Sequence, residues 1–256
     1  MGANSEIAWT DHTFNPWWGC ARVSPGCQHC YAEMFAKRTG NKVWGVDAPR
    51  RFFGDKHWAE PLAWNSAAEK AGKRARVFSA SMADVCEDRR DLDDQRDRLW
   101  DLIDATPALD WLLLTKRPQH IRRFIPPEII ERAWVGVTVE DVDRLERIDT
   151  LKDINALVQF VSCEPLLEDL GALILDGIDW VIVGGESGPG ARRMELDWAR
   201  SIRRECERQG VWFFYKQGGA VHRCQHDAKG GCLDCAPGDL RVREIPAWAE
   251  AGTDQP

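Results

Sequence analysis

Short apolar segments rich in β-branched and aromatic residues recur along the chain, and they constrain its fold more than any other feature. Each segment is followed by a polar turn and then by a stretch with helical character. Near-continuous apolar strands that alternate with helices are typical of a parallel sheet buried on both faces. The segments lie at 76–79, 111–115, 134–139, 158–162, 180–184 and 211–216, and segment 7–14 is expected to add one more strand.

The stretches between these strands have the periodicity of amphipathic helices. In 91–105 the apolar residues fall largely on one side, and the helix is expected to end before Pro107. Segments 140–151 and 196–209 show the same pattern, and Gly210 is expected to end the second of them. The sequence therefore predicts about six to seven β/α units.

Two architectures accept that number of units: an open doubly wound sheet, and a partial or closed TIM-like barrel. Polar residues follow nearly every predicted strand. In a barrel these strand ends converge on one mouth, whereas in an open sheet only those beside the switch point meet. We therefore expect an α/β fold with a partial or closed parallel β/α barrel. The polar residues concerned are Ser79, Ser81, Asp84, Thr115, Lys116, Arg117, Thr138, Glu140, Ser162, Glu164, Glu186, Ser187, Lys216 and Gln217.

Cysteine usage and charge limit the class of protein. Six of the nine cysteines fall in two tight clusters, which indicates reduced thiols that hold metal and favours a cytoplasmic location over a secreted disulfide scaffold. No run of eighteen apolar residues is present, so we expect no membrane span. The net charge of −7 argues against a surface that holds duplex DNA by phosphate contacts alone, but it allows a local basic groove.

The first cluster contains Cys20, Cys27 and Cys30. The last two are separated by two residues, and the Pro-Gly turn before Cys27 lets Cys20 return as a third soft ligand. A structural zinc ion needs a fourth ligand, which His29 or His12 could supply. A four-iron cluster instead leaves one iron open for a substrate. We expect an iron–sulfur cluster at the mouth of the barrel, with a zinc knuckle as the alternative.

Four further motifs stand out in the sequence: Trp9-Thr-Asp-His-Thr-Phe-Asn-Pro, Gly19-Cys20, Ser24-Pro-Gly-Cys27-Gln-His-Cys30-Tyr-Ala and Gly184-Gly-Glu-Ser-Gly-Pro. Together they resemble a phage-associated group of uncharacterised proteins, which in turn resembles radical S-adenosylmethionine (SAM) enzymes. The resemblance extends from about residue 7 to residue 217. The common radical SAM spacing has three residues between the first two cysteines, whereas this chain has six.

The resemblance implies a partial barrel, a [4Fe-4S] cluster on the three cysteines, and SAM bound to its open iron. A reduced cluster would cleave SAM to methionine and a 5′-deoxyadenosyl radical that takes hydrogen from a substrate. The protein's own contribution is positioning and exclusion of water. An electron donor is implied as a partner, and the phage association suggests modification or repair of a nucleic acid or nucleotide.

The same analogy suggests where SAM binds. It places the methionine amine near the polar groups after the second strand, which here are Ser79, Ser81 and Asp84. The carboxylate of Asp84 suits an ammonium group. Thr138 or Glu140, after a later strand, are expected to meet the ribose hydroxyls.

Three further strand-end residues are candidates for contact with substrate. Lys116 can hold a carboxylate or phosphate, with a surface cation as the alternative. Glu164 can bind a cation or accept a proton. Glu186 follows two glycines that let the backbone approach a ligand closely, although a tight turn without ligand contact would use the same residues.

The second cluster contains Cys224, His226, Cys232 and Cys235, and His222 lies just before it. Three cysteines and two histidines within fourteen residues predict a zinc site, or an auxiliary iron–sulfur cluster. Zinc is favoured because histidines are available and the loop has too few apolar residues to order itself. We expect a barrel at 1–217, with a Cys/His-rich loop and tail at 218–256 packed on it, acting as a lid or flap.

Two other functions compete with a radical SAM enzyme. In the first, both clusters bind zinc and the chain is a non-catalytic module that recognises nucleic acid or a partner protein. In the second, Asp84, Glu164 or Glu186 acts with His12 in metal-dependent hydrolysis. The second is less favoured because the sequence has no compact motif of histidines and carboxylates.

Overall fold

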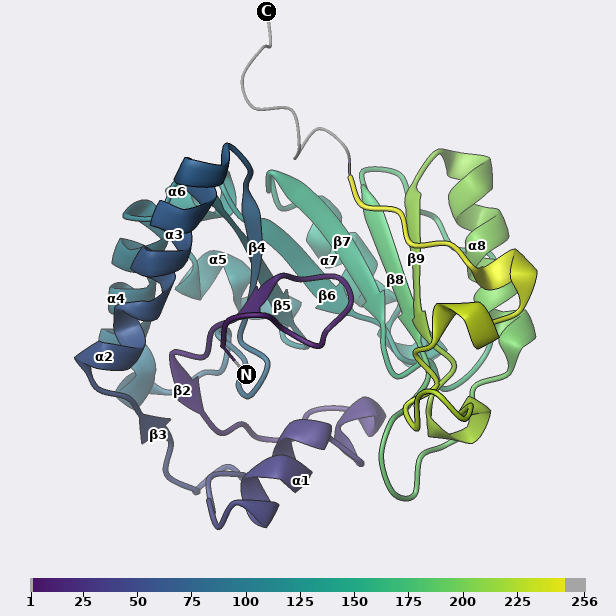
Figure 1. Ribbon diagram of the computed structural model, residues 1–256, viewed down its shortest axis with the longest axis horizontal. Helices are drawn as coiled ribbons and strands as arrows, with labels where there is room; N and C mark the ends of the chain where they lie inside the picture. The colour runs from purple at the N-terminus through teal and green to yellow at the C-terminus, as the bar shows by residue number, and fades with distance from the viewer. Residues whose placement is uncertain (1, 247–256) are drawn as a thin grey trace, which may run out of the picture.

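A computed structural model describes residues 2–246, and a curved sheet of parallel strands lies at its centre (Figure 1). Its seven strands are ordered β1-β4-β5-β6-β7-β8-β9, and every neighbouring pair is parallel. All C-terminal strand ends therefore lie at one edge of the sheet. The strands are β1 His12–Thr13, β4 Ala75–Ser79, β5 Leu109–Thr115, β6 Trp134–Thr138, β7 Val158–Cys163, β8 Trp180–Gly184 and β9 Trp212–Gln217.

Helices cover the convex face of this sheet (Figure 1). The segment between β1 and β4 forms a small antiparallel ribbon of β2 (Trp17–Trp18) and β3 (Arg51–Phe52), with α1 between them. Figure 1 shows α1 beside the C-terminal strand ends. The helices are α1 Tyr31–Arg38, α2 Asp55–Trp58, α3 Glu60–Ala71, α4 Asp93–Asp104, α5 Ile121–Phe124, α6 Pro127–Ile130, α7 Glu146–Lys152 and α8 Leu196–Gln209.

Alternation of side chains along the strands sorts the core into two layers. One side of each strand packs under the helices, and the other fills the concave face with an aromatic inner layer. The ring centroids of Trp9 and Phe78 lie 4.6 Å apart, and Trp134 meets Trp180 edge to face at 5.8 Å. The other buried members of the inner layer are Leu112, Val158, Phe160, Ile182 and Phe214.

The barrel is open, so the partial barrel is correct and a closed one is wrong. The free edge of β9 is occupied by a later segment, because Tyr215 N–H donates to the Val242 carbonyl at 2.8 Å and Glu244 N–H to the Phe213 carbonyl at 3.0 Å. β9 therefore has no edge left for β1. β1 is also shorter than the expected 7–14, since Trp9 turns into the concave face.

The three predicted helices are present, and two of them start later than expected. The expected helix 140–151 begins only at Glu146, after a 3₁₀ turn at Val142–Arg144. α4 begins at Asp93, and α8 matches its predicted bounds. None of the helices in 2–246 has the length and apolar content needed to cross a membrane.

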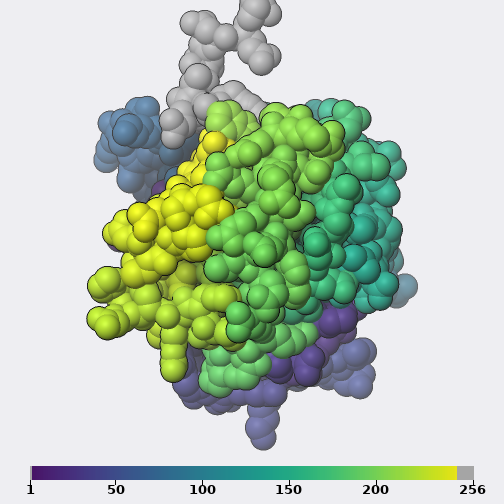
Figure 2. Space-filling view, turned by 90° about the vertical axis from the view of Figure 1, so that its right-hand side faces the viewer, coloured from purple at the N-terminus to yellow at the C-terminus, as the bar shows by residue number. Residues whose placement is uncertain are grey.

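The C-terminal segment has no regular strand or long helix in its described part, as the sequence predicts. It contains the 3₁₀ turns Ala220–His222, Leu233–Cys235 and Gly238–Leu240. In Figure 2 this yellow-green and yellow segment lies against the green residues of the α8 and β9 region. We call residues 218–240 the flap.

Candidate functional site

A polar belt lies above the aromatic inner layer at the C-terminal strand ends, which we call the mouth. Strand alternation directs Lys116, Thr138, Ser162, Glu164 and Lys216 to the concave side. Lys216 Nζ lies 2.7 Å from Glu164 Oε1, and the Ser162 hydroxyl lies 3.3 Å from the other carboxylate oxygen. Lys116 Nζ donates to the Thr138 hydroxyl at 3.3 Å. Two lysines and one carboxylate therefore share the mouth.

Gly184 makes room for the carboxylate in this belt. A Cβ at position 184 would lie 2.5 Å from Glu164 Oε1, which is closer than real Cβ atoms approach any heavy atom. Any other residue at the end of β8 would push Glu164 away from Lys216. The close approach of backbone predicted for the Gly-Gly-Glu motif is therefore present at Gly184, against the Glu164 carboxylate.

Residues 19–31, which we call the cysteine loop, carry the first cluster across the mouth. Cys20 follows β2, Cys27 ends a 3₁₀ turn at Pro25–Cys27, and Cys30 directly precedes α1. At one end the Gly19 amide donates to the Met82 carbonyl at 3.0 Å. At the other end the Tyr31 hydroxyl donates to the Ser81 carbonyl at 2.8 Å. The loop is thus attached to the segment that follows β4.

A buried arginine attaches the loop to β5. Arg117 Nη1 donates to Asp84 Oδ2 at 2.7 Å, and Nη2 donates to the Ala21 carbonyl at 2.8 Å. The guanidinium also lies 3.7 Å from Cys20 Sγ. Burial raises the pKa of the Cys20 thiol to about 12, with Asp84 adding to that rise and Arg117 opposing it. Cys20 is therefore protonated at neutral pH unless a cation binds it.

A buried glutamate attaches the loop to the end of β6. Glu140 is fully buried, and it accepts hydrogen bonds from the Gly26 amide at 3.3 Å and from Arg147 at 3.0 Å. A Cβ on Gly26 would lie 3.0 Å from the Glu140 carboxyl group. Glycine at position 26 therefore lets the turn before Cys27 sit directly on this carboxylate.

Glu186 attaches the loop to the segment after β8. Glu186 Oε2 lies 3.0 Å from His29 Nδ1 and accepts the Arg192 amide at 2.8 Å, while the Arg192 guanidinium pairs with both carboxylate oxygens. Arg192 Nη1 also donates to the Pro25 carbonyl at 3.1 Å. Burial alone would raise the pKa of Glu186, but the hydrogen bonds from Arg192 and His29 hold it below its ordinary value of 4.5.

One of the two cysteine clusters forms a compact group of donor atoms. Within residues 2–246, the second cluster has all its donor atoms within 4.8 Å of one another. One tetrahedral zinc ion with bonds of 2.3 Å holds its sulfurs about 3.8 Å apart. Cys20, Cys27 and Cys30 do not belong to this group.

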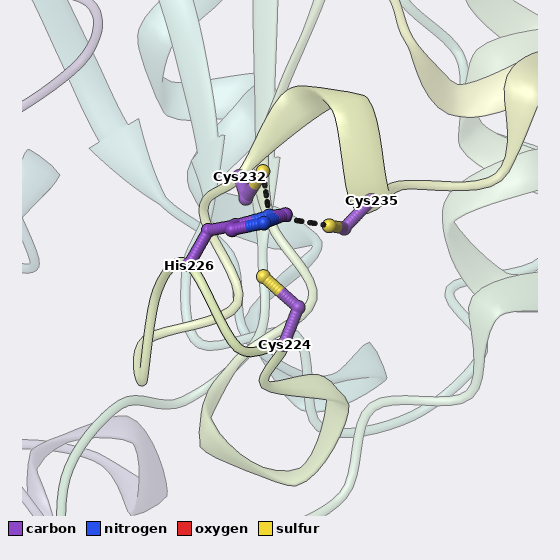
Figure 3. A group of neighbouring side chains, drawn as sticks. All are labelled: Cys224, His226, Cys232 and Cys235. Atoms are coloured by element: carbon purple, nitrogen blue, oxygen red, sulfur yellow. Dashed lines mark hydrogen bonds between the residues drawn. The ribbon is translucent and has the colours of Figure 1, made fainter.

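The second cluster can hold a metal ion. Figure 3 shows Cys224, His226, Cys232 and Cys235 pointing toward one another. His226 Nδ1 lies 3.3 Å from Cys235 Sγ and 3.8 Å from Cys232 Sγ. His222 is not part of this group, because its Nε2 contacts the Met194 carbonyl at 2.8 Å.

Two carboxylates predicted to bind SAM already have protein partners. Asp84 accepts hydrogen bonds from the Thr115 hydroxyl at 2.7 Å and from the amides of Cys86 and Lys116, besides its ion pair with Arg117. Glu140 is engaged in the same way by Gly26 and Arg147. These two side chains position the cysteine loop through their protein partners.

The other predicted SAM contacts lie near the mouth in different orientations. Ser79 ends β4 on the same side as Val77, under the helices, and its buried hydroxyl has no hydrogen-bond partner. The Ser81 hydroxyl lies 3.1 Å from Asn15 Nδ2. Thr138 lies in the polar belt. His12, the predicted partner in hydrolysis, stacks on Trp64 with ring centroids 4.5 Å apart.

Several residues that build the site could not be assigned this role from sequence. Asn15 Oδ1 accepts the Met82 amide at 2.7 Å, so the end of the N-terminal motif holds the loop after β4. Arg192 belongs to a basic pair that resembles a solvated surface, and Lys216 has no distinctive neighbours in sequence. Only their position after a predicted strand marked Arg117 and Lys216 as candidates.

Comparison with known proteins identifies a family but not an activity. Residues 4–239 match a family described as proteins of unknown function, DUF5131, and the chain belongs to it. The match continues past residue 217, so all of the flap except its last residue lies within the matched range. No curated protein and no solved structure in the comparison matches the chain.

Proposed function

We propose that this member of the DUF5131 family is a radical SAM enzyme, with a [4Fe-4S] cluster held by Cys20, Cys27 and Cys30. The observation that carries the proposal is the placement of the cysteine loop. It is fixed to the segments after β4, β5, β6 and β8, directly over the mouth. Three soft ligands at the strand ends of an open β/α barrel fit a cluster that leaves one iron open for SAM.

When bound and reduced by an external one-electron donor, the cluster would cleave SAM to methionine and a 5′-deoxyadenosyl radical that takes hydrogen from the substrate. The chain's own residues bind and orient the reactants. Arg117 and Glu140 fix the cysteine loop, the aromatic inner layer excludes water from below, and the polar belt faces the reacting molecules.

The substrate proposed is anionic, as a nucleotide or nucleic acid would be. A groove of about 540 Å³ runs from Val23 of the cysteine loop along Lys116 to α7. Among residues 2–246, Arg144 and Lys116 line it without an ion pair to a carboxylate, whereas Arg117 and Arg147 are already paired. Glu146 is the one acidic residue in this lining, so basic residues outnumber it. Lys116 thus stands where the groove meets the mouth and can hold a phosphate or carboxylate. Glu164 is the proposed group for a substrate cation or proton, held in place by Lys216.

Metal content and electron paramagnetic resonance of the anaerobically purified, dithionite-reduced protein test this proposal. We expect about four irons and a signal that changes when SAM is added. Replacing Cys20, Cys27 and Cys30 with alanine should remove both, whereas Cys206→Ala, which alters a buried thiol in α8, should remove neither. Iron retained by the triple variant, or a spectrum indifferent to SAM, would refute the radical mechanism. Zinc in both clusters would favour the binding module instead.

A further inference from the structure

We propose that Cys224, His226, Cys232 and Cys235 bind one zinc ion in a closed tetrahedral site, and that this ion fixes the flap to the mouth. The zinc site itself is independent of the proposed radical chemistry. The proposed effect of the zinc ion on the cysteine loop deepens the proposed function and rests on that function.

The donor geometry matches a single ion. Zinc bonds of 2.3 Å to sulfur and about 2.05 Å to nitrogen place a tetrahedral sulfur–nitrogen pair about 3.6 Å apart. The distances from His226 Nδ1 to Cys235 and Cys232 are 3.3 and 3.8 Å, on either side of that value. The Cys224 sulfur lies within 4.8 Å of the other three donor atoms.

The chemistry of the donors selects a structural zinc ion. Three thiolates and an imidazole are soft to borderline ligands, which suit zinc and disfavour magnesium or calcium. Four protein ligands fill a tetrahedral coordination shell, so no position remains for a substrate or a catalytic water. A four-iron cluster would require more space between the sulfurs than this group provides.

The flap has little else to hold it in shape. Between residues 218 and 240, the buried apolar side chains are Ala236 and Leu240, both after the last cysteine. The reversal before Cys232 depends on Asp227, whose carboxylate accepts the Lys229 amide at 2.7 Å and the Gly231 amide at 3.0 Å. Hydrophobic burial is thus too small to order this turn, and metal binding supplies free energy that the apolar core does not.

The turn between the zinc ligands packs on Gly218 and Gly219, the first two residues of the flap after β9. The Gly218 amide donates to the Gly230 carbonyl at 2.9 Å, and a Cβ on Gly230 would lie 2.5 Å from the Gly219 carbonyl oxygen. Arg243 Nη2 donates to the carbonyls of Gly231 and Lys216, at 2.8 and 2.9 Å. The turn between the ligands therefore sits against the C-terminal end of β9.

These glycines in turn hold Glu186. The Ala220 amide donates to the Glu186 carbonyl at 2.9 Å, and a Cβ on Gly219 would lie 2.6 Å from the same oxygen. The Glu186 carboxylate contacts His29 between Cys27 and Cys30. A continuous chain of backbone packing and hydrogen bonds thus links the zinc site to the cysteine loop.

The test uses the full chain with Cys232→Ser and Cys235→Ser, and Asp234→Asn as the matched control. Asp234 lies in the same 3₁₀ turn with an exposed side chain, so its substitution changes charge but leaves all four donors intact. Elemental analysis should give about one zinc per chain in the wild type and the control, and none in the double variant. Iron in place of zinc, or zinc retained by the double variant, would overturn the proposal.

Hydrogen exchange of the same proteins tests the link to the mouth. Without zinc, we expect amide exchange in peptides covering 184–192 and 218–231 to be at least tenfold faster, while peptides from β5 and β6 keep their protection. Unchanged exchange in 184–192 would refute the mechanical link. Zinc is also measured after Cys20, Cys27 and Cys30 are replaced with alanine. A normal zinc content there separates this site from any failure of the iron–sulfur proposal.

Discussion

The ion pair between Arg117 and Asp84 offers a sharp test of how the cysteine loop is supported. Both side chains are 7% exposed, and the guanidinium bridges Asp84 and the Ala21 carbonyl. Replacing Arg117 with methionine keeps the length of the side chain but leaves the carboxylate buried without its counter-charge. Breaking a buried pair from one side costs about 3–5 kcal/mol of the free energy of unfolding.

The lower end of that range applies here. Asp84 keeps three other donors after the substitution, namely the Thr115 hydroxyl and the amides of Cys86 and Lys116. We therefore expect Arg117→Met to cost about 3 kcal/mol, and Asp84→Asn to cost about 2 kcal/mol. The double variant removes both charges at once. It should cost about 3 kcal/mol rather than the sum, which corresponds to a coupling of about 2 kcal/mol.

Urea unfolding under anaerobic conditions, followed by tryptophan fluorescence, measures these differences. Arg132→Met is the matched control, because Arg132 also pairs with a carboxylate, Asp104, but the two side chains are 44% and 53% exposed. It should change stability by less than about 1 kcal/mol. Additive costs for Arg117→Met and Asp84→Asn, or a cost no greater than that of the control, would show that the buried pair does not support the loop as argued.

Two further predictions concern the other attachments of the loop. Gly26→Ala places a methyl group 3.0 Å from the buried Glu140 carboxylate, which cannot move because Arg147 holds it. It should cost about 1–3 kcal/mol and lower the bound iron, and a variant with wild-type stability and iron content would contradict the close packing. Glu186→Gln tests the pH dependence of stability. The pKa of Glu186 is lowered in the folded state, so the ionised carboxylate stabilises the fold above pH 4.5. This contribution to the free energy of unfolding is lost as the pH falls through the folded-state pKa. The stability difference from the wild type should therefore be constant near neutrality and shrink below pH 4.5, and a difference that grows toward acid would reverse the assigned sign.

The sheet was predictable because its central strands are almost fully buried. Segment 180–184 is apolar throughout and segment 158–162 departs from this only at Gln159 and Ser162, and that pattern has few interpretations other than a strand covered on both faces. The N-terminal strand was overestimated for a physical reason. Trp9 fills the concave face instead of extending β1, and a single indole that changes side leaves no trace in the apolar pattern.

The polar residues of the mouth were predictable in position but not in role. Their place after each strand follows from the fold, so Lys116, Glu164 and Lys216 were identifiable as a group. What each one touches depends on partners distant in the sequence. Asp84 was expected to face an ammonium group and instead holds Arg117, because sequence does not reveal which of two nearby strand ends carries the counter-charge.

The two cysteine clusters look alike in sequence, since each ends in a Cys-x-x-Cys pair with a third cysteine upstream. What separates them is the framework that carries the third ligand. Cys20 is held against Arg117 after β5, in a loop that is also hydrogen-bonded to the segments after β4 and β6. Cys224 belongs to a flap with little core of its own, and it lies close to its partners in the same turn. In the two proposals, a strand end fixed by buried ion pairs holds the polynuclear cluster, and a loop without a core holds one small ion that draws its ligands together. The same short motif would then serve catalysis at one site and architecture at the other.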